Sequence, residues 1–335
     1  MTSIDILQIG LGPLGRKMII FMAERPAFRL VSAVDNDAAL VGKDAGELCG
    51  LPRTGITVTP NLRKAAADSK PHIAVVTTVS GIKRITPLIL EILGLGIPVV
   101  TSCEELSYPW ITAPEEAAAL HACAAANNVA VLATGVNPGF LMDLLPVTLT
   151  AVCKNVDKVV VRRFQNAEFR RVPFQKKIGA GLSLEEFEKK RKEGTLRHVG
   201  LTESIHMIAA RFGWTLEKTT EELSPVTAAA RIETKDLVIE PGSAAGVRQV
   251  GRGFVNGREK IVLEFQAAVG EKKPVDSVEI QGEPSFVSSV PGGINGDIAT
   301  CALTLNAVPR VLEAIPGLHT MTDISPVSFF ETVKR

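Results

Sequence analysis

Two adjacent carboxylates, Glu104 and Glu105, follow an apolar run at residues 97–101 that is typical of a buried strand. In an open parallel sheet, ligands bind beyond the carboxyl ends of the strands, so this segment is expected to face a ligand. A carboxylate there can activate the water that attacks an iminium, the product of amine oxidation by hydride transfer. Because adjacent side chains point apart on most backbones, only one of the two acids is expected to enter the site, and Glu104 is favoured over Glu105.

Such a glutamate needs a pKa raised toward neutrality, by burial or by its carboxylate neighbour. The alternative is that both acids are solvated loop residues that cap the helix beginning at Pro114 or pair with surface bases.

Three glycines near the start of the chain have the spacing that binds the diphosphate of a nucleotide. Gly10, Gly12 and Gly15 form GxGxxG directly after an apolar run at residues 4–9 and at the head of a helical pattern. Such glycines permit a tight turn, close approach of the backbone to a pyrophosphate, and close packing of helix on strand. The helix N-terminus then offers free N–H groups to the phosphates. The pattern predicts a dinucleotide-binding turn.

Asp35 ends the next predicted strand, twenty residues after Gly15. A carboxylate there can accept hydrogen bonds from the adenosine ribose hydroxyls and would repel a 2′-phosphate. The expected cofactor is NAD or NADP, with NAD favoured by Asp35, although the nearby Lys43 leaves NADP open. The expected cofactor-binding residues are Gly10, Gly12, Pro13, Leu14, Gly15, Asp35, Asn36, Thr77, Thr78, Ser80 and Asn137.

Two further segments at strand ends are expected to meet the cofactor and the substrate. Residues 77–80 would pass over the ribose and pyrophosphate, although serine and threonine are also ordinary turn formers. In residues 134–140, Asn137 could bond the nicotinamide amide and Phe140 could form a wall of the substrate pocket. The Asn-Pro-Gly sequence could equally serve only to build a turn.

The first half of the chain alternates apolar runs with helical patterns, which is typical of a parallel sheet wrapped by helices. Strands are predicted at residues 4–9, 29–35, 72–78, 97–101 and 129–133. Helices are predicted at 14–24, 61–67, 82–95 and 114–126. The fold class is therefore α/β, a Rossmann-type doubly wound parallel sheet, joined to a second α+β domain with a mixed or antiparallel sheet.

The second domain is indicated by alternating strands after about residue 150. Strands are predicted at 156–165, 237–239, 248–254, 260–267 and 275–280, and helices at 184–192, 203–212 and 297–312. Asn256-Gly257 predicts a type I′ hairpin turn. The predicted domains are 1–150 for the dinucleotide, 151–296 for substrate binding and dimerisation, and 297–335 returning to the first domain.

Composition and charge exclude several classes of function. The 335 residues are 46% hydrophobic and 22% charged, with a formal net charge of +1, so a nucleic-acid or membrane partner is not expected. The five cysteines are odd in number and widely spaced, which favours reduced thiols. No apolar run approaches the roughly 20 residues that span a bilayer, and no signal sequence is recognised, so a cytoplasmic protein is expected.

Charged and histidine side chains of the second domain give weaker indications. Arg163 lies in a basic stretch that could bind a carboxylate, although a solvated face is the default interpretation. His198 could touch substrate or relay a proton, or lie in a surface loop. The five histidines lack ligand spacing, so no metal is implied.

Several segments together resemble the 2,4-diaminopentanoate dehydrogenase family and the related amine dehydrogenases, whose cofactor domain is similar to that of dihydrodipicolinate reductase. The resemblance covers nearly the whole chain. The generic part is GLGPLG at 10–15, and the specific parts are EELSYPW at 104–110 and TGVNPGF at 134–140. Supporting segments are LVGKD at 40–44, ESI at 203–205, PGGI at 291–294 and GDIAT at 296–300.

The resemblance implies a catalytic glutamate in the Glu104-Glu105 pair, a substrate pocket between the domains, and a homodimer. The chain lacks the paired histidines followed by lysine of dihydrodipicolinate reductase itself. His206 stands where the family often has tyrosine, and it joins Phe140, Arg163 and His198 as an expected substrate-pocket residue.

The leading hypothesis is an NAD(P)-dependent oxidoreductase that catalyses reversible oxidative deamination of a small amine or diamino acid, with ammonia and a ketone or aldehyde as the reverse substrates. One alternative is an NAD(P)-dependent carbonyl or cyclic-imine reductase that uses no ammonia. A non-enzymatic alternative is a regulatory protein that senses the nucleotide.

Overall fold

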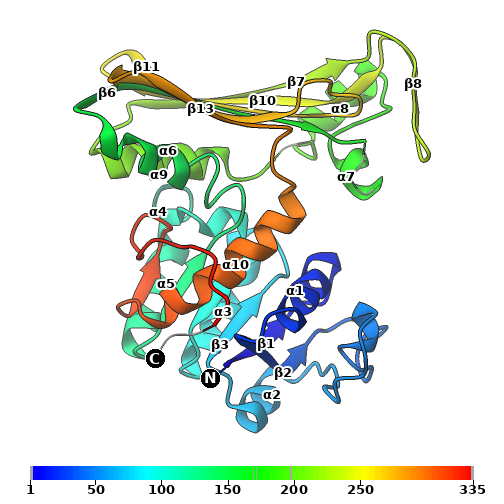
Figure 1. Ribbon diagram of the computed structural model, residues 1–335, viewed down its shortest axis with the longest axis vertical. Helices are drawn as coiled ribbons and strands as arrows, with labels where there is room; N and C mark the ends of the chain where they lie inside the picture. Colours follow the sequence, from blue (N-terminus) through cyan, green and yellow to red (C-terminus); the bar gives the residue numbers. More distant parts are fainter. Residues whose placement is uncertain (1–2, 169, 171, 197, 333–335) are drawn as a thin grey trace. The chain divides into compact units, whose positions relative to one another are not determined.

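The computed structural model describes residues 3–168, 170, 172–196 and 198–332. The chain forms two compact units (Figure 1). The first contains the chain up to Phe140 and from Asn295 onward, and the second is Leu141–Ile294.

The first unit is built on a parallel six-stranded sheet with the strand order β14-β5-β4-β3-β1-β2. The strands are β1 Ile4–Ile9, β2 Phe28–Val34, β3 Ile73–Val76, β4 Val99–Thr101, β5 Ala130–Ala133 and β14 Gly317–His319. The chain leaves β1 toward β2 on one side and later continues from β3 on the other. The junction of β1 and β3 is therefore the switch point, where ligands bind in open sheets.

Helices cover both faces of this sheet, as the prediction of a doubly wound fold requires (Figure 1). The principal helices are α1 Pro13–Ala23, α2 Leu62–Ser69, α3 Ile82–Gly94, α5 Pro114–Ala126 and α10 Gly296–Leu312, with the short α4 at Pro109–Thr112. Helix α3 packs beside α5, and α1 packs beside α10. Because both faces are covered, every residue of β1 is buried, which explains why the strand is an almost continuous apolar run.

The second unit contains a mixed six-stranded sheet with the order β13-β12-β6-β11-β10-β7. Strand β11 pairs parallel with β6, and the other neighbours are antiparallel. The strands are β6 Asn155–Asn166, β7 Lys218–Thr227, β10 Ala244–Val255, β11 Arg258–Ala268, β12 Val275–Glu283 and β13 Phe286–Pro291. The unit also contains α6 Leu144–Leu149, α7 Val172–Lys177, α8 Leu184–Lys192, α9 Leu201–Phe212 and the small pair β8 Ile232–Glu233 and β9 Val238–Ile239.

The predicted hairpin is confirmed. Strands β10 and β11 are antiparallel neighbours joined through Asn256 and Gly257, whose φ angles are 51° and 69°. Positive φ at both central residues is the geometry that a type I′ turn requires.

The two faces of the second sheet differ because side chains alternate along a strand. On one face, Gly251 lies against Ile205 and Leu201 of α9. The opposite face, which we call the outer face, carries the buried cluster Val160, Val250 and Val262.

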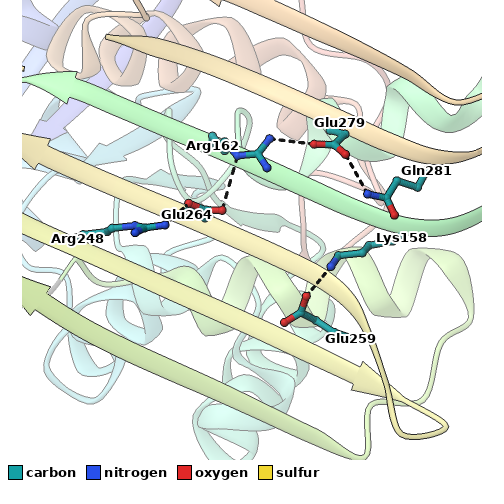
Figure 2. A network of polar contacts seen from close by, with 7 residues as sticks. All are labelled: Lys158, Arg162, Arg248, Glu259, Glu264, Glu279 and Gln281. Atoms are coloured by element: carbon teal, nitrogen blue, oxygen red, sulfur yellow. Dashed lines mark hydrogen bonds and ion pairs between the residues drawn. The ribbon is translucent and has the colours of Figure 1, made fainter. Parts of the chain in front are cut away.

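The outer face also carries a network of charged side chains, which Figure 2 shows. Arg162 lies 2.9 Å from Glu279 and 3.6 Å from Glu264, and Arg248 lies 2.7 Å from the same Glu264. The charges of the network alternate in sign across strands β10, β11, β6 and β12.

Some predicted boundaries differ from the structure. Residues 141–150 belong to the second unit rather than the first, because α6 packs against α9 and β12. The return to the first unit begins at Asn295, where the Asn295 side chain caps α10 by accepting hydrogen bonds from the backbone N–H groups of Asp297 and Ile298. Strands β7, β8, β13 and β14 were not predicted. Within the described part of the chain, no helix combines the length and apolar content needed to cross a bilayer.

Candidate functional site

The three glycines of the glycine-rich turn have different surroundings and therefore different roles. A Cβ added to Gly15 would lie 1.9 Å from the Gly10 carbonyl oxygen, and one added to Gly10 would lie 2.7 Å from the Thr77 carbonyl oxygen. These two glycines are therefore required by the packing of the protein itself. A Cβ on Gly12 would meet no protein atom within 4 Å. Gly12 thus leaves an open cradle at the N-terminus of α1, which is where a phosphate would approach the backbone.

Buried side chains from β1 and β3 hold this turn in place. Thr77 Oγ1 donates to the Gly10 carbonyl at 2.9 Å, and Gln8 Nε2 donates to the same carbonyl at 3.0 Å and to Thr77 Oγ1 at 2.8 Å. Thr77, predicted to touch the cofactor, supports the turn through its side chain. Gln8 was not predicted as a site residue; its signal was an amide side chain within an apolar strand.

Asp35 also contacts the glycine-rich turn. Its Oδ2 accepts from the Leu11 N–H at 2.6 Å, and its Oδ1 accepts from the Asp37 N–H at 2.8 Å. Each oxygen keeps capacity for a further hydrogen bond, because an ionised carboxylate offers about four acceptor positions. The Asp35 carboxylate therefore fixes the turn and can still accept a ribose hydroxyl.

One pocket of about 580 Å³ at the carboxyl ends of β1 and β2 is lined by Gly10, Gly12, Asp35 and Thr77. The pocket brings together seven of the predicted cofactor residues: Gly10, Gly12, Pro13, Asp35, Asn36, Thr77 and Thr78. Leu14, Gly15, Ser80 and Asn137 do not line it. Arg16, which was not predicted, does. The open cradle at Gly12 and the carboxylate at the ribose position fit a nicotinamide dinucleotide.

The two candidate glutamates lie in a 3₁₀ turn, Glu104–Leu106, that follows β4. Glu105 Oε2 accepts from the Ile82 N–H at 2.9 Å, so this side chain caps the N-terminus of α3. The capping role considered for these acids is therefore real for Glu105, but the helix is α3 rather than the one beginning at Pro114. Glu104 Oε2 is shielded from solvent.

The glutamate turn is tied to the loop that follows β3. Cys103 Sγ donates to the Ser80 carbonyl at 3.1 Å, and the Glu105 N–H donates to the same carbonyl at 3.2 Å. The predicted residue Ser80 therefore positions the turn through its backbone. Burial raises the pKa of the Cys103 thiol to about 12, so this thiol stays protonated at neutral pH and is not a nucleophile.

The segment after β5 contains buried polar atoms that have no hydrogen-bond partner among the described residues. Both amide atoms of Asn137 are in this state, and the residue is only 6% exposed; Thr134 Oγ1 is similar. The Val136 N–H donates to Thr300 Oγ1 of α10 at 3.2 Å, which anchors the segment. An unsatisfied buried amide costs about 1–3 kcal/mol, so this arrangement points to a ligand that supplies the missing partners.

The predicted substrate residues of the second unit do not share one arrangement. Arg163, only 2% exposed, donates to Asp276 at 3.1 Å and to the Ile294 carbonyl at 3.1 Å, so its charge is balanced within the protein. His206 is half-buried on α9, and burial lowers its pKa.

His198 has its backbone held by Gln249, which accepts from its N–H at 2.8 Å and donates to its carbonyl at 2.9 Å. Its ring packs on Phe265, with the two ring centroids 4.4 Å apart. Burial, followed by the nearby Lys177 and Arg163, lowers the pKa of His198 to about 3, so the imidazole is neutral.

Phe140 is half-buried and ends the first part of the first unit. The assignment of Phe140, Arg163, His198 and His206 to the substrate pocket stays a prediction.

Comparison with known proteins agrees with this arrangement. The family model of the 2,4-diaminopentanoate dehydrogenase C-terminal domain matches residues 140–334, and that of the dihydrodipicolinate reductase N-terminus matches residues 4–100. A 2,4-diaminopentanoate dehydrogenase of Acetoanaerobium sticklandii is 31% identical over 97% of this chain and 94% of its own length.

Solved structures show the same fold. An amine dehydrogenase from Mycobacterium smegmatis superposes with a TM-score of 0.86 at 21% identity, over 99% of both chains. GenD2 from gentamicin A biosynthesis, solved in complex with NAD, gives a TM-score of 0.57 at 15% identity, over 96% of this chain and 90% of its own.

The doubly wound sheet and its glycine-rich turn place the protein among the dehydrogenases that use a nicotinamide cofactor. Within that class, the chain belongs to the 2,4-diaminopentanoate dehydrogenase family. The predicted fold class and the predicted family are both confirmed.

Proposed function

We propose that this protein is an NAD(P)-dependent oxidoreductase that catalyses the reversible oxidative deamination of a small amine or diamino acid. Membership of the 2,4-diaminopentanoate dehydrogenase family supports an amine as the hydride donor and a nicotinamide as the hydride acceptor. The observation that supports the mechanism is that the two adjacent glutamates have different surroundings. Glu105 caps α3, whereas Glu104 follows β4 at the edge where ligands of such sheets bind, and its Oε2 is shielded from water.

The bound nicotinamide supplies the chemistry of hydride acceptance, which converts the amine into an iminium ion. The Glu104 carboxylate then takes a proton from a water molecule while the water oxygen bonds to the iminium carbon. The π electron pair of the C=N bond moves to nitrogen. Protonated Glu104 returns that proton to the carbinolamine nitrogen. The C–N bond breaks, ammonia leaves, and the hydroxyl proton passes to the carboxylate as the carbonyl forms.

The preferred cofactor under this proposal is NAD. Asp35 lies in the pocket beside Asn36, where an adenosine ribose is bound in this fold. Its negative charge favours a free 2′-hydroxyl and disfavours a 2′-phosphate. We place the nicotinamide end of the cofactor near Asn137, because a carboxamide can pair with both unsatisfied atoms of that side chain.

A deamination screen tests the proposal. Purified protein is incubated with NAD or NADP and a panel of amino acids, diamino acids and plain amines, and reduced cofactor is followed by its absorbance. We expect turnover with at least one amine, and strict dependence on ammonium in the reverse direction with the matching ketone. Equal ketone reduction without ammonium would favour the carbonyl reductase alternative. Tight nucleotide binding with no turnover over the panel would favour a regulatory protein.

We further propose that the protein is a homodimer that buries the outer face of the second sheet. That face carries a valine cluster. It also carries a network of both signs of charge (Figure 2), which can meet a copy of itself without like charges being forced together.

Charging the outer face should split the dimer. Val287 pairs with Glu279 on that face and is 64% exposed, so Val287→Glu leaves the folded unit intact but introduces an unpaired charge. We expect the mass measured by sedimentation to fall by half. The control is Ile315→Glu in the first unit, which is 76% exposed and should leave the mass unchanged. A monomeric wild type, or a dimeric Val287→Glu variant, would contradict the proposed interface.

A further inference from the structure

Arg16 lies beside the glycine-rich turn and is held there by its own side chain. Its Nε donates to the Leu11 carbonyl at 2.9 Å. The other end of residue 11, its N–H, donates to Asp35. Leu11 is therefore fixed at both polar groups, by a cation from α1 and by a carboxylate after β2. The hydrogen bond from Nε therefore holds the Arg16 guanidinium beside the turn. Arg16 lines the same pocket as Gly12 and Asp35.

The guanidinium is well suited to a further contact. An arginine carries five N–H donors in a planar fork, and only the Nε donor of Arg16 is used by a described residue. The two terminal nitrogens are thus available to a ligand. Paired N–H groups of this kind match the geometry of phosphate oxygens better than a lysine does.

The charges around Arg16 make it the natural anchor for an anionic ligand. The other ionisable side chains that line the pocket among the described residues are the carboxylates of Asp35, Asp37 and Glu91. Glu91 is paired with Arg63 at 2.8 Å, but the two aspartates are not balanced by any lining cation besides Arg16. A dinucleotide carries at least two negative charges, so its binding beside these acids requires a compensating cation.

We propose that Arg16 is a further cofactor-binding residue that donates its terminal N–H groups to a phosphate of the dinucleotide. The inference rests on the proposed nicotinamide site and extends it to a residue outside the glycine motif. The phosphate is either the pyrophosphate, common to NAD and NADP, or the 2′-phosphate of NADP. Either source has the same chemistry, and binding measurements distinguish them.

The test compares dissociation constants of the wild type and Arg16→Gln for NAD and NADP by isothermal titration calorimetry. One to two charge-assisted hydrogen bonds correspond to an increase of roughly 10- to 100-fold. A similar increase for both cofactors assigns Arg16 to the pyrophosphate, and an increase confined to NADP assigns it to the 2′-phosphate. Changes below about twofold for both cofactors would overturn the proposal.

Two controls separate a phosphate contact from a role in shaping the turn. Lys17 is the next residue of α1, and its side chain does not line the pocket. Lys17→Gln also removes a cation, but it should leave the dissociation constants for NAD and NADP unchanged. Salt weakens charge pairing, so the slope of log Kd against log salt concentration should be shallower for Arg16→Gln than for the wild type. An unchanged slope with weaker binding would mean that Arg16 only supports the turn, and this would also overturn the proposal. If the wild type binds neither cofactor, the proposed function itself fails, which is a distinguishable result.

Discussion

Replacing Glu104 by glutamine should lower kcat for amine oxidation by about 10²- to 10⁴-fold, the usual contribution of a general acid–base group. Glutamine has nearly the same shape as glutamate, but it cannot take a proton from the attacking water. Binding of the dinucleotide should be unchanged, because Glu104 does not line the pocket that contains the glycine-rich turn. The measurements are steady-state kinetics with the substrate found by screening and calorimetric titration of the cofactor.

Glu105→Gln is the matched control for this experiment. Its remaining amide oxygen can still accept from the Ile82 N–H, so the cap of α3 survives and turnover should stay within a few-fold of the wild type. Glu105→Ala removes the acceptor and should lower the free energy of unfolding by about 1 kcal/mol, as for loss of a helix cap. Full activity of Glu104→Gln would remove the basis of the mechanism, and a larger loss in Glu105→Gln would reverse the assignment.

The identities of the two glutamates show where sequence reasoning stops. The position of the pair after a buried strand was predictable, because a continuous apolar run ends at Thr101 and parallel strands share a carboxyl edge. Their separate roles were not, because the cap joins Glu105 to Ile82, the first residue of α3 and 23 positions earlier in the chain. Such a contact depends on how α3 and β4 pack, and no local pattern encodes it.

In the second unit, and at the last strand of the chain, local features could likewise be predicted and long-range contacts could not. The hairpin at Asn256-Gly257 was predictable because its turn chemistry is local. The ion pair of Arg163 and Asp276 joins the neighbouring strands β6 and β12. These residues are far apart in the sequence, so the sequence alone suggested a solvated basic stretch or a substrate carboxylate, and not this internal partner. Strand β14 is three residues long and has too little periodicity to be recognised.

The glycine motif was predictable as a motif, but its members have different roles in the structure. Gly12→Ala should weaken binding of the dinucleotide by roughly 100-fold, equivalent to losing one to two charge-assisted hydrogen bonds to backbone N–H groups. The added methyl would occupy the cradle where the pyrophosphate approaches, since no protein atom lies within 4 Å of it. Gly12 has φ −62° and ψ −177°, a conformation that alanine adopts without strain. The thermal midpoint of the cofactor-free protein should therefore be unchanged.

This separation of binding from stability is the decisive feature of the Gly12→Ala experiment. Gly15→Ala places its methyl 1.9 Å from the Gly10 carbonyl oxygen, so it should lower the thermal midpoint as well as abolish binding. Gly94 lies at an exposed position of α3, and a Cβ added there would meet no atom within 4 Å. Gly94→Ala should therefore lower neither the cofactor affinity nor the thermal midpoint. If Gly12→Ala binds NAD as tightly as the wild type, the phosphate does not approach α1 at this turn. The Gly12 cradle would then not be the pyrophosphate site, and the placement of the dinucleotide in this pocket would have to be abandoned.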